Sequence, residues 1–299
     1  MSAAERTKVG FVGLGTMGWP MSANIARAGF DVVGIDADPE LARRWAAEHG
    51  QTAASGPEDF ADVGVVVTML PNGAIVRQAI LDGGIADALP DGAVVMDMSS
   101  AEPSATLSLA PELESRGVGL VDAPVSGARP KAIDGTLTIM LGGEDEAAID
   151  KVTPVLETMS ANIFRTGPLG SGHAMKALNN FLGASAYTTA VEALAIGKEF
   201  GLDPRVMLDV VNSSTGRSFN TEVVLKDDVV TGRYGTGFAL GLLAKDVGIA
   251  AGLAEAVGVD APACQLVRDR WAEAAAALGF AADHSEAHKQ WWPIDLAAD

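Results

Sequence analysis

Residues 9–18, VGFVGLGTMG, decide the fold of this chain. An apolar run of strand length leads here into glycines spaced as G-x-G-x-x-G, and the amphipathic stretch 19–27 follows. Gly13 permits a tight turn, Gly15 lets a phosphate approach the backbone, and Gly18 allows the helix to pack closely on the strand. The N–H groups at the start of that helix would face an anion. The pattern predicts a dinucleotide-binding turn made of Gly13, Leu14, Gly15, Thr16, Met17 and Gly18.

A second apolar run, FDVVGID at residues 30–36, ends in an acidic residue. Asp36 follows the glycine turn by about 20 residues, the position at which this kind of domain binds the hydroxyls of the adenine ribose. A carboxylate there repels the 2′-phosphate that distinguishes NADP from NAD. We therefore expect NAD to be the cofactor in preference to NADP.

Apolar runs of strand length alternate with amphipathic helical stretches through the first half of the chain. After the first two runs they occupy residues 63–70, 93–99, 119–125, 136–143 and 161–167. That alternation predicts βαβ units and a mostly parallel sheet with helices on both faces. The fold class is therefore α/β, with a Rossmann-type doubly wound domain at the N-terminus.

The character of the sequence changes after Gly167, because the strand-like runs stop. Stretches rich in alanine and leucine follow at 174–200 and 236–278, which are typical of helices. The glycine-rich GPLGSG at 167–172 breaks the pattern and begins a long helix. We expect an NAD-binding domain at 1–166 and an all-helical domain for substrate and oligomer contacts at 167–299, joined by an interdomain helix at about 172–200.

Composition excludes several classes of partner. The 39 acidic and 21 basic residues give a formal net charge of −18, which would repel a phosphate backbone, so no nucleic acid is expected. No run reaches the ~18 apolar residues of a membrane span, so no membrane contact is expected. A strand pattern begins at Val9 and leaves no room for a secretory leader, and the single cysteine, Cys264, fits a buried core position. These features predict a cytoplasmic protein.

The histidines show no zinc-binding spacing, and no metal site is expected. His49, His284 and His288 lie in polar stretches that predict exposed side chains. His173, three residues before Lys176, is interpreted as structural. Trp291 and Trp292 near the C-terminus need cover, which either the substrate site or a subunit contact would provide.

Four blocks of the sequence together resemble the β-hydroxyacid dehydrogenase family, which includes 3-hydroxyisobutyrate dehydrogenase and tartronate semialdehyde reductase. They are GFVGLGTMGWPM at 10–21, DAPVSGARPKAIDGTLTIMLGG at 122–143, GPLGSGHAMKALNNF at 167–181 and AKDVGIA at 244–250. Their order and spacing match the family over nearly the whole chain. The resemblance implies a Rossmann domain, a long interdomain helix, a helical C-terminal domain and a homodimer or homotetramer.

The resemblance also implies the catalytic residues. Lys176 matches the catalytic lysine of the family, and Asn180 matches its substrate-orienting asparagine, with Asn179 as the rival amide. Positions four apart share one face of a helix, so both side chains can reach one substrate. The apolar neighbours Met175 and Leu178 would partly desolvate the lysine, which favours the neutral amine that accepts a proton.

Further positions follow from the same resemblance. Ser126, Gly127 and Ala128 match the loop that binds the substrate carboxylate, although Ala128 stands where most members have a second glycine, which puts the local backbone conformation in question. Lys245 matches a lysine that reaches the substrate from the helical domain, although an ion pair with its own neighbours is the alternative. Three residues are expected to lie along the cofactor: Leu70, Pro71 and Ser100.

These residues predict an NAD-dependent oxidoreductase that acts on a small anionic 3-hydroxy carboxylic acid of the 3-hydroxyisobutyrate or tartronate semialdehyde type. An imine or other carbonyl reductase on the same architecture is the alternative, although imine reductases usually lack the lysine. A 6-phosphogluconate dehydrogenase would have a histidine where this chain has Asn179. A non-catalytic dinucleotide-binding module is the last alternative, and it would have no reason to retain Lys176 or the carboxylate loop.

Overall fold

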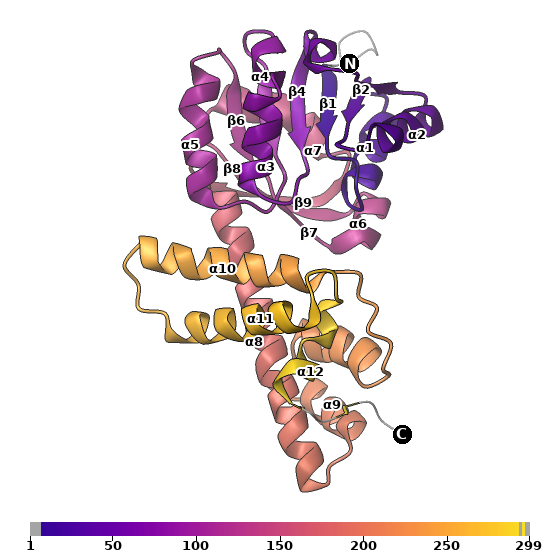
Figure 1. Cartoon of the computed structure of the whole chain (residues 1–299), viewed down its shortest axis with the longest axis vertical. Helices are drawn as coiled ribbons and strands as arrows, with labels where there is room; N and C mark the ends of the chain where they lie inside the picture. Colours follow the sequence, from indigo (N-terminus) through magenta and orange to yellow (C-terminus); the bar gives the residue numbers. More distant parts are fainter. Residues whose placement is uncertain (1–6, 293–294, 297–299) are drawn as a thin grey trace. The chain divides into compact units, whose positions relative to one another are not determined.

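The computed structural model describes residues 7–292 and 295–296, and the chain divides into two compact units, 1–176 and 177–299 (Figure 1). The division falls inside one long helix, α8, which spans Ser171–Phe200. The domain bounds 1–166 and 167–299 therefore stay a prediction, and the two units are described one at a time.

The first unit contains a sheet of nine strands in the described part of the chain, in the order β3-β2-β1-β4-β5-β6-β8-β7, with β9 beside β8. The strands are β1 Lys8–Val12, β2 Val32–Ile35, β3 Thr52–Ala53, β4 Val63–Thr68, β5 Val94–Asp97, β6 Gly119–Asp122, β7 Val125–Ser126, β8 Leu137–Gly142 and β9 Ser160–Gly167. The expected mostly parallel sheet is confirmed, but β8 runs antiparallel to β6 and β7. The two-residue strand β3 was not predicted.

Helices cover both faces of this sheet, and neighbouring strand residues point to opposite faces. Val65 and Val67 of β4 belong to one core cluster, while Val66 between them belongs to the other. The helices of this unit are α1 Gly18–Arg27, α2 Pro39–His49, α3 Gly73–Arg77, α4 Ile85–Ala88, α5 Pro103–Glu114, α6 Ala128–Asp134 and α7 Glu146–Leu156. The continuous apolar runs in the sequence thus reflect burial on two faces.

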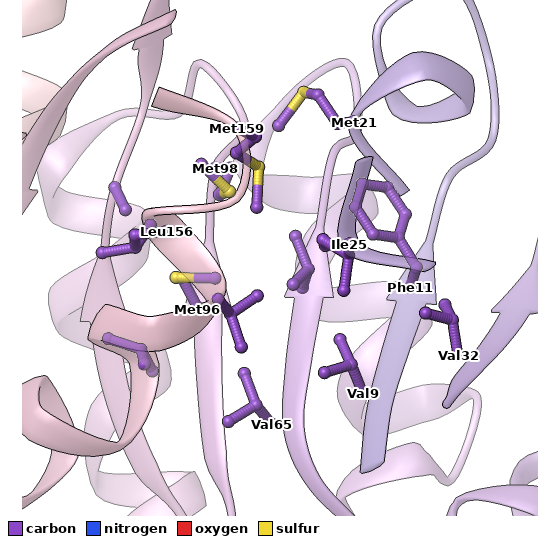
Figure 2. Packing of buried hydrophobic residues seen from close by; sticks show 14 of the residues in the cluster. Val9, Phe11, Met21, Ile25, Val32, Val65, Met96, Met98, Leu156 and Met159 are labelled. Carbon is purple, nitrogen blue, oxygen red and sulfur yellow. The ribbon is translucent and has the colours of Figure 1, made fainter. Parts of the chain in front are cut away.

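Figure 2 shows the packing on one face, where Phe11 and Val65 of the strands lie among Met21 and Ile25 of α1 and Leu156 of α7. Each of these five side chains is buried. Contacts of this density fix α1 against the sheet, and the turn that precedes α1 is fixed with it.

Strand β1 lies between β2 and β4, so the chain winds away from β1 in both directions. In an open parallel sheet, the loops at the carboxyl ends of the strands on the two sides of such a point form a crevice for a ligand. The loops in question begin at Gly13, Asp36 and Met69.

The second unit is helical, as expected. After α8 it contains α9 Pro204–Asn212, α10 Leu240–Ala256, α11 Pro262–Leu278 and α12 His288–Trp291. The apolar stretch 236–278 forms two helices and not one, because Gly258 takes a left-handed conformation after α10 and Pro262 begins α11. Such a glycine ends a helix and such a proline starts the next.

Aromatic side chains fill the core of the second unit. Tyr187, Trp271 and Trp291 pack edge to face, with ring centroids 5.4 to 6.2 Å apart. His284 and His288 are buried beside them, so the prediction that these two histidines are exposed was wrong. Trp291 is covered by its own unit and not by a substrate or a second subunit, while Trp292 is partly buried against the same cluster. Cys264 is buried, as expected.

Candidate active site

The glycine turn between β1 and α1 has the geometry of a dinucleotide site. Gly13 has a φ of 97°, and a Cβ on it would lie 2.5 Å from the carbonyl oxygen of Met69. A Cβ on Gly18 would lie 1.8 Å from the carbonyl oxygen of Gly13. A Cβ on Gly15 would meet no other described residue within 4 Å, which leaves this backbone open to a phosphate. The first turn of α1 has neither a side-chain cap nor an acidic residue to compete with an anion.

Asp36 stands directly after β2 and faces the glycine turn. Its Oδ2 accepts a hydrogen bond from the backbone N–H of Leu14 at 2.7 Å, and its Oδ1 accepts one from the N–H of Asp38 at 3.0 Å. The side chain is half-buried. The two bonds fix the carboxylate beside the turn, and the oxygens retain lone pairs for ribose hydroxyls.

The loops after β4 and β5 are tied together. The backbone N–H of Leu70 donates a hydrogen bond to the hydroxyl of Ser99 at 2.9 Å. Leu70 and Ser100 are half-buried, and Pro71 is exposed. These positions lie at the carboxyl ends of strands on the same side of β1.

The loop between β7 and α6 carries Ser126, Gly127 and Ala128. Ser126 pairs with Thr138 across two antiparallel strands. Gly127 has a φ of 135°, and Ala128 has a φ of 55°. The alanine that stands where most family members have glycine thus has a left-handed backbone conformation, in which a Cβ costs about 1–2 kcal/mol. Ser126 and Gly127 are half-buried, and Ala128 is exposed.

The predicted catalytic residue, Lys176, is half-buried on the second turn of α8. The first turn is bound to the sheet through the carboxylate of Asp122, which accepts hydrogen bonds from the N–H of Gly170 at 2.7 Å and of His173 at 2.8 Å. His173 is buried and hydrogen-bonded at both ring nitrogens, which agrees with its interpretation as structural.

In the second unit, Asn180 and Lys245 meet at a buried carboxylate. The side-chain amide of Asn180 donates a hydrogen bond to Oδ2 of Asp246 at 2.6 Å. The ammonium of Lys245 lies 3.0 Å from Oδ1 of the same residue. The ion pair with a neighbour, given above as the alternative for Lys245, is therefore present. Asn179 donates a longer hydrogen bond, 3.3 Å, to the Asn180 carbonyl oxygen.

Sequence reasoning missed two carboxylates that hold these residues, Asp122 and Asp246. Both stand in blocks that carry the family resemblance, and that position was the only available signal. Apart from Lys245, which is adjacent to Asp246, their partners lie 48 to 66 residues away in sequence, so no local pattern could reveal those contacts. Among the residues that the structure describes, no group of three histidines, cysteines or acidic residues is arranged to hold a metal. No helix within that part of the chain is long and apolar enough to cross a membrane.

Comparison with known families matches both parts of the chain. Residues 8–167 match the family described as the NAD binding domain of 6-phosphogluconate dehydrogenase. Residues 170–291 match the family described as the NAD-binding region of NADP-dependent 3-hydroxyisobutyrate dehydrogenase.

Individual relatives are similar over most of their length. The 2-(hydroxymethyl)glutarate dehydrogenase of Eubacterium barkeri is 37% identical over 244 residues, which are 81% of each chain. The mitochondrial 3-hydroxyisobutyrate dehydrogenase of Homo sapiens is 34% identical over 258 residues, 83% of this chain and 76% of that one. Among solved structures, the Mycobacterium tuberculosis 3-hydroxyisobutyrate dehydrogenase with L-serine superposes with a TM-score of 0.86 at 33% identity, covering 95% of this chain and 99% of that one.

Proposed function

The chain belongs to the β-hydroxyacid dehydrogenase family, and from this we propose that it transfers a hydride between NAD and a small 3-hydroxy carboxylic acid, with Lys176 as the acid–base residue. That it is a hydroxyacid dehydrogenase using a nicotinamide dinucleotide follows from its relatives. The observation that carries the finer proposal is the place of Lys176, half-buried on the first turns of a helix that is bonded directly to the ends of the sheet.

The residues present fit a dinucleotide. The backbone at Gly15 is open, the start of α1 has no competing acidic residue, and the Asp36 carboxylate stands beside the turn. When bound, the nicotinamide supplies the hydride acceptor. We assign the pyrophosphate to the turn from Gly13 to Gly18 and the adenine ribose to Asp36. Leu70, Pro71 and Ser100 would line the rest of the cofactor.

The remaining residues would act on the substrate. The hydroxyl of Ser126 and the backbone N–H groups of Gly127 and Ala128 would hold the carboxylate, and Lys245 would add a positive charge. Asn180, oriented by Asp246, would hold the substrate hydroxyl. Neutral Lys176 would accept the proton of that hydroxyl as the hydride leaves the carbon, and would return it as an ammonium in the reverse reaction.

We propose NAD in preference to NADP because a carboxylate at position 36 repels a 2′-phosphate. The comparisons leave this preference open. The description of one matching family names an NADP-dependent enzyme. A structural neighbour of 24% identity is a complex with NADP+, although a likeness at that identity supports the fold alone.

The names of the relatives suggest the substrate class. 3-Hydroxyisobutyrate, 2-(hydroxymethyl)glutarate and L-serine all carry a hydroxymethyl group on the carbon next to a carboxylate. Glycerate, the reduced form of tartronate semialdehyde, has the same unit. We therefore propose that the substrate of this chain is an acid with a hydroxymethyl group at that carbon. This chemical group places the carboxylate and the reacting hydroxyl at a fixed separation. That separation suits a site in which the loop at Ser126 and the amine of Lys176 belong to the same compact unit.

The test is a panel of these acids with NAD and with NADP, followed by NADH or NADPH absorbance. On the best substrate, Lys176→Ala should lower turnover by roughly 10²- to 10⁴-fold, the usual contribution of a positioned proton-transfer group. Lys176→Arg should fail nearly as badly, because a guanidinium does not release its proton near neutral pH. Lys151→Ala, which removes a half-buried lysine of α7 that donates to the Gly92 carbonyl, is the matched control. If Lys176→Ala kept most of its turnover, the assignment of the base would be wrong.

We also propose that the chain forms a homodimer or homotetramer through its helical unit. Apolar side chains are exposed along the C-terminal part of α8 and along α9, and Phe200 is 84% exposed. Ile196 and Phe200 share one face of α8, as Val206 and Val210 share one face of α9, and neighbouring exposed apolar side chains of this kind are typical of an interaction surface. Sedimentation velocity of the native chain and of Phe200→Glu tests this, since the variant should dissociate. A native chain that sediments as a monomer would contradict the proposal.

A further inference from the structure

Three neighbouring strands of the first unit end in buried polar residues that stand side by side. Thr68 at the end of β4 pairs in register with Asp97 of β5, and Asp97 pairs with Asp122 of β6. The two carboxylates are 2% and 0% exposed. Buried carboxylates need hydrogen-bond partners, so the partners of Asp97 and Asp122 show which parts of the structure these two residues hold in place.

Asp97 is bound by residues at the end of the neighbouring strand and in the loop that follows its own strand. Its Oδ1 accepts hydrogen bonds from the Thr68 hydroxyl at 2.8 Å and from the N–H of Ser99 at 3.0 Å. This carboxylate therefore shapes the start of the loop after β5, and the Ser99 hydroxyl in turn binds the N–H of Leu70.

Asp122 is satisfied by the helix that carries the catalytic lysine. Its two oxygens accept the N–H groups of Gly170 and His173, at 2.7 and 2.8 Å. These are N–H groups at the start of α8, which have no partner within the helix, and a negative charge at this end of a helix is favourable. The carboxylate thus caps α8 from the sheet and not from the preceding loop.

His173 adds a second attachment in the same turn. Its Nε2 lies 3.1 Å from the carbonyl oxygen of Ser99, which can only accept, so Nε2 carries the hydrogen. Its Nδ1 lies 2.8 Å from the hydroxyl of Thr106 on α5. The ring is 1% exposed, with an oxygen of Asp97 and one of Asp122 each 3.8 Å away.

The backbone of α8 also lies directly on the sheet at this point. A Cβ on Gly172 would stand 2.3 Å from the carbonyl oxygen of Met140 and 2.8 Å from Oδ2 of Asp122. A Cβ on Gly142 would stand 2.4 Å from Oδ1 of Asp122. Because the Gly172 backbone packs against the Met140 carbonyl and both glycines pack against the Asp122 carboxylate, the first turn of α8 has little freedom to shift or rotate.

We propose that Asp122 and His173 are positioning residues, which set the place of the Lys176 amine against the cofactor loops and the substrate loop. Asp122 begins the segment that leads to Ser126, and His173 binds the loop that leads to Ser100. Lys176 follows His173 by three residues on the same helix. One buried network therefore joins the first turn of the helix that carries the predicted base to the loops that lead to Ser126 and Ser100. The proposal rests on the proposed role of Lys176.

The first test uses near-isosteric variants. Asp122→Asn keeps the shape but can accept only one of the two N–H groups, and Thr106→Val removes the partner of His173 without changing its volume. Both should lower kcat by roughly 10- to 100-fold, since a small misplacement of a catalytic group costs up to about 100-fold. The KM for the acid and the Kd for NAD should change less than about threefold, because the binding loops remain. Thr106→Ser, which keeps the hydroxyl that binds His173, should retain most of the native turnover.

A double-mutant cycle separates positioning from other roles. In a Lys176→Ala background, Asp122→Asn should cause less than about a twofold further loss, because the group that it positions is gone. Thr153→Val, which removes an equivalent helix hydroxyl from α7 in the same unit, should leave kcat unchanged. Thermal unfolding of each variant shows whether the first unit remains folded, and Thr106→Val carries the test if Asp122→Asn does not fold.

The outcomes are distinct. Unchanged kcat in Asp122→Asn and Thr106→Val, with Lys176→Ala inactive, would overturn the positioning role and leave the proposed function intact. A loss from Asp122→Asn that is equally large with and without the lysine would also overturn it. Full turnover in Lys176→Ala alone would overturn the proposed base, and the positioning role with it.

Discussion

The side-chain amide of Asn180 donates a hydrogen bond of 2.6 Å to the buried carboxylate of Asp246, and this bond decides which way the amide points. With its nitrogen committed to a carboxylate, the asparagine keeps its oxygen on the other side, where Asn179 donates to it at 3.3 Å. The ammonium of Lys245 lies on the second oxygen of Asp246 at 3.0 Å. Two residues predicted to contact the substrate thus share one anchor.

Asp246→Asn should therefore disturb both residues while changing the local volume little. An amide at this position no longer fixes the orientation of Asn180 and no longer neutralises Lys245. Hydrogen bonds to charged groups contribute about 1.5–3 kcal/mol, so kcat/KM for the acid should fall by roughly 10- to 100-fold. Initial rates at saturating NAD measure it. Asp260→Asn, in the exposed turn between α10 and α11, is the control and should behave as the native enzyme.

Asp36→Asn should narrow the preference for NAD over NADP. The amide oxygen can still accept from the N–H of Leu14, so the glycine turn should stay formed, but the charge that repels a 2′-phosphate is gone. Removing one like-charge repulsion of about 1 kcal/mol should raise kcat/KM for NADP by roughly 5- to 10-fold. Parallel assays with the two cofactors show the change. A native enzyme that prefers NADP would contradict this prediction.

Ala128→Gly should stabilise the first unit slightly. Ala128 has a φ of 55°, which costs a residue with a Cβ about 1–2 kcal/mol, whereas glycine loses about 0.5–1 kcal/mol more chain entropy on folding. The net gain of about 0.5–1 kcal/mol should raise the melting temperature by roughly 1–4 °C. Ala47→Gly, exposed on α2, is the matched control and should lower it. Equal losses in both variants would mean that the alanine conformation is not strained.

The helical unit should lose stability as the pH falls from neutrality. Burial lowers the pKa of His288 to about 4, from an ordinary value of 6.5, and burial lowers the pKa of His284 as well. Above pH 6.5 the two histidines are mostly neutral in the folded and in the unfolded chain, so they do not reduce stability. Between pH 6.5 and 4 the unfolded chain takes up the proton first, which favours unfolding. For His288 alone the loss at pH 4.5 should reach about 2–3 kcal/mol.

Urea denaturation followed by circular dichroism at pH 7.5 and 4.5 measures this loss. His288→Gln should reduce the difference between the two pH values, while His49→Gln, in the other unit, should not. A difference that persists unchanged in His288→Gln would show that other groups cause the acid sensitivity.

Much of the fold was predictable because burial on both faces leaves continuous apolar runs such as residues 63–70 in the sequence. Strand direction was not predictable from such runs, since the antiparallel course of β8 depends on which neighbours it pairs with. Strand β3 has two residues, too few for any periodicity. The histidines were misjudged because the local sequence DHSEAHK is polar, while their cover comes from Tyr187 and Trp271, roughly 100 residues and about 15 residues earlier in the chain.

The candidate site divides in the same way. The glycine turn and Asp36 follow a local spacing, and the structure places the Asp36 carboxylate against that turn. The functional roles of Lys176, Asn180 and Ser126 came from family resemblance, and they stay predictions. The supporting carboxylates Asp122 and Asp246 needed the tertiary structure, because a single acidic residue in an apolar block shows neither its burial nor its partner.

The aromatic core of the helical unit has a spectroscopic consequence. Of the five tryptophans in the chain, Trp19 and Trp45 belong to the first unit, and the other three, Trp271, Trp291 and Trp292, to the second. A chain with Trp19→Phe and Trp45→Phe would emit from the helical unit alone. Its fluorescence would then report the unfolding of that unit separately, and a difference from the signal of the native chain would reveal whether the two halves unfold as one cooperative system.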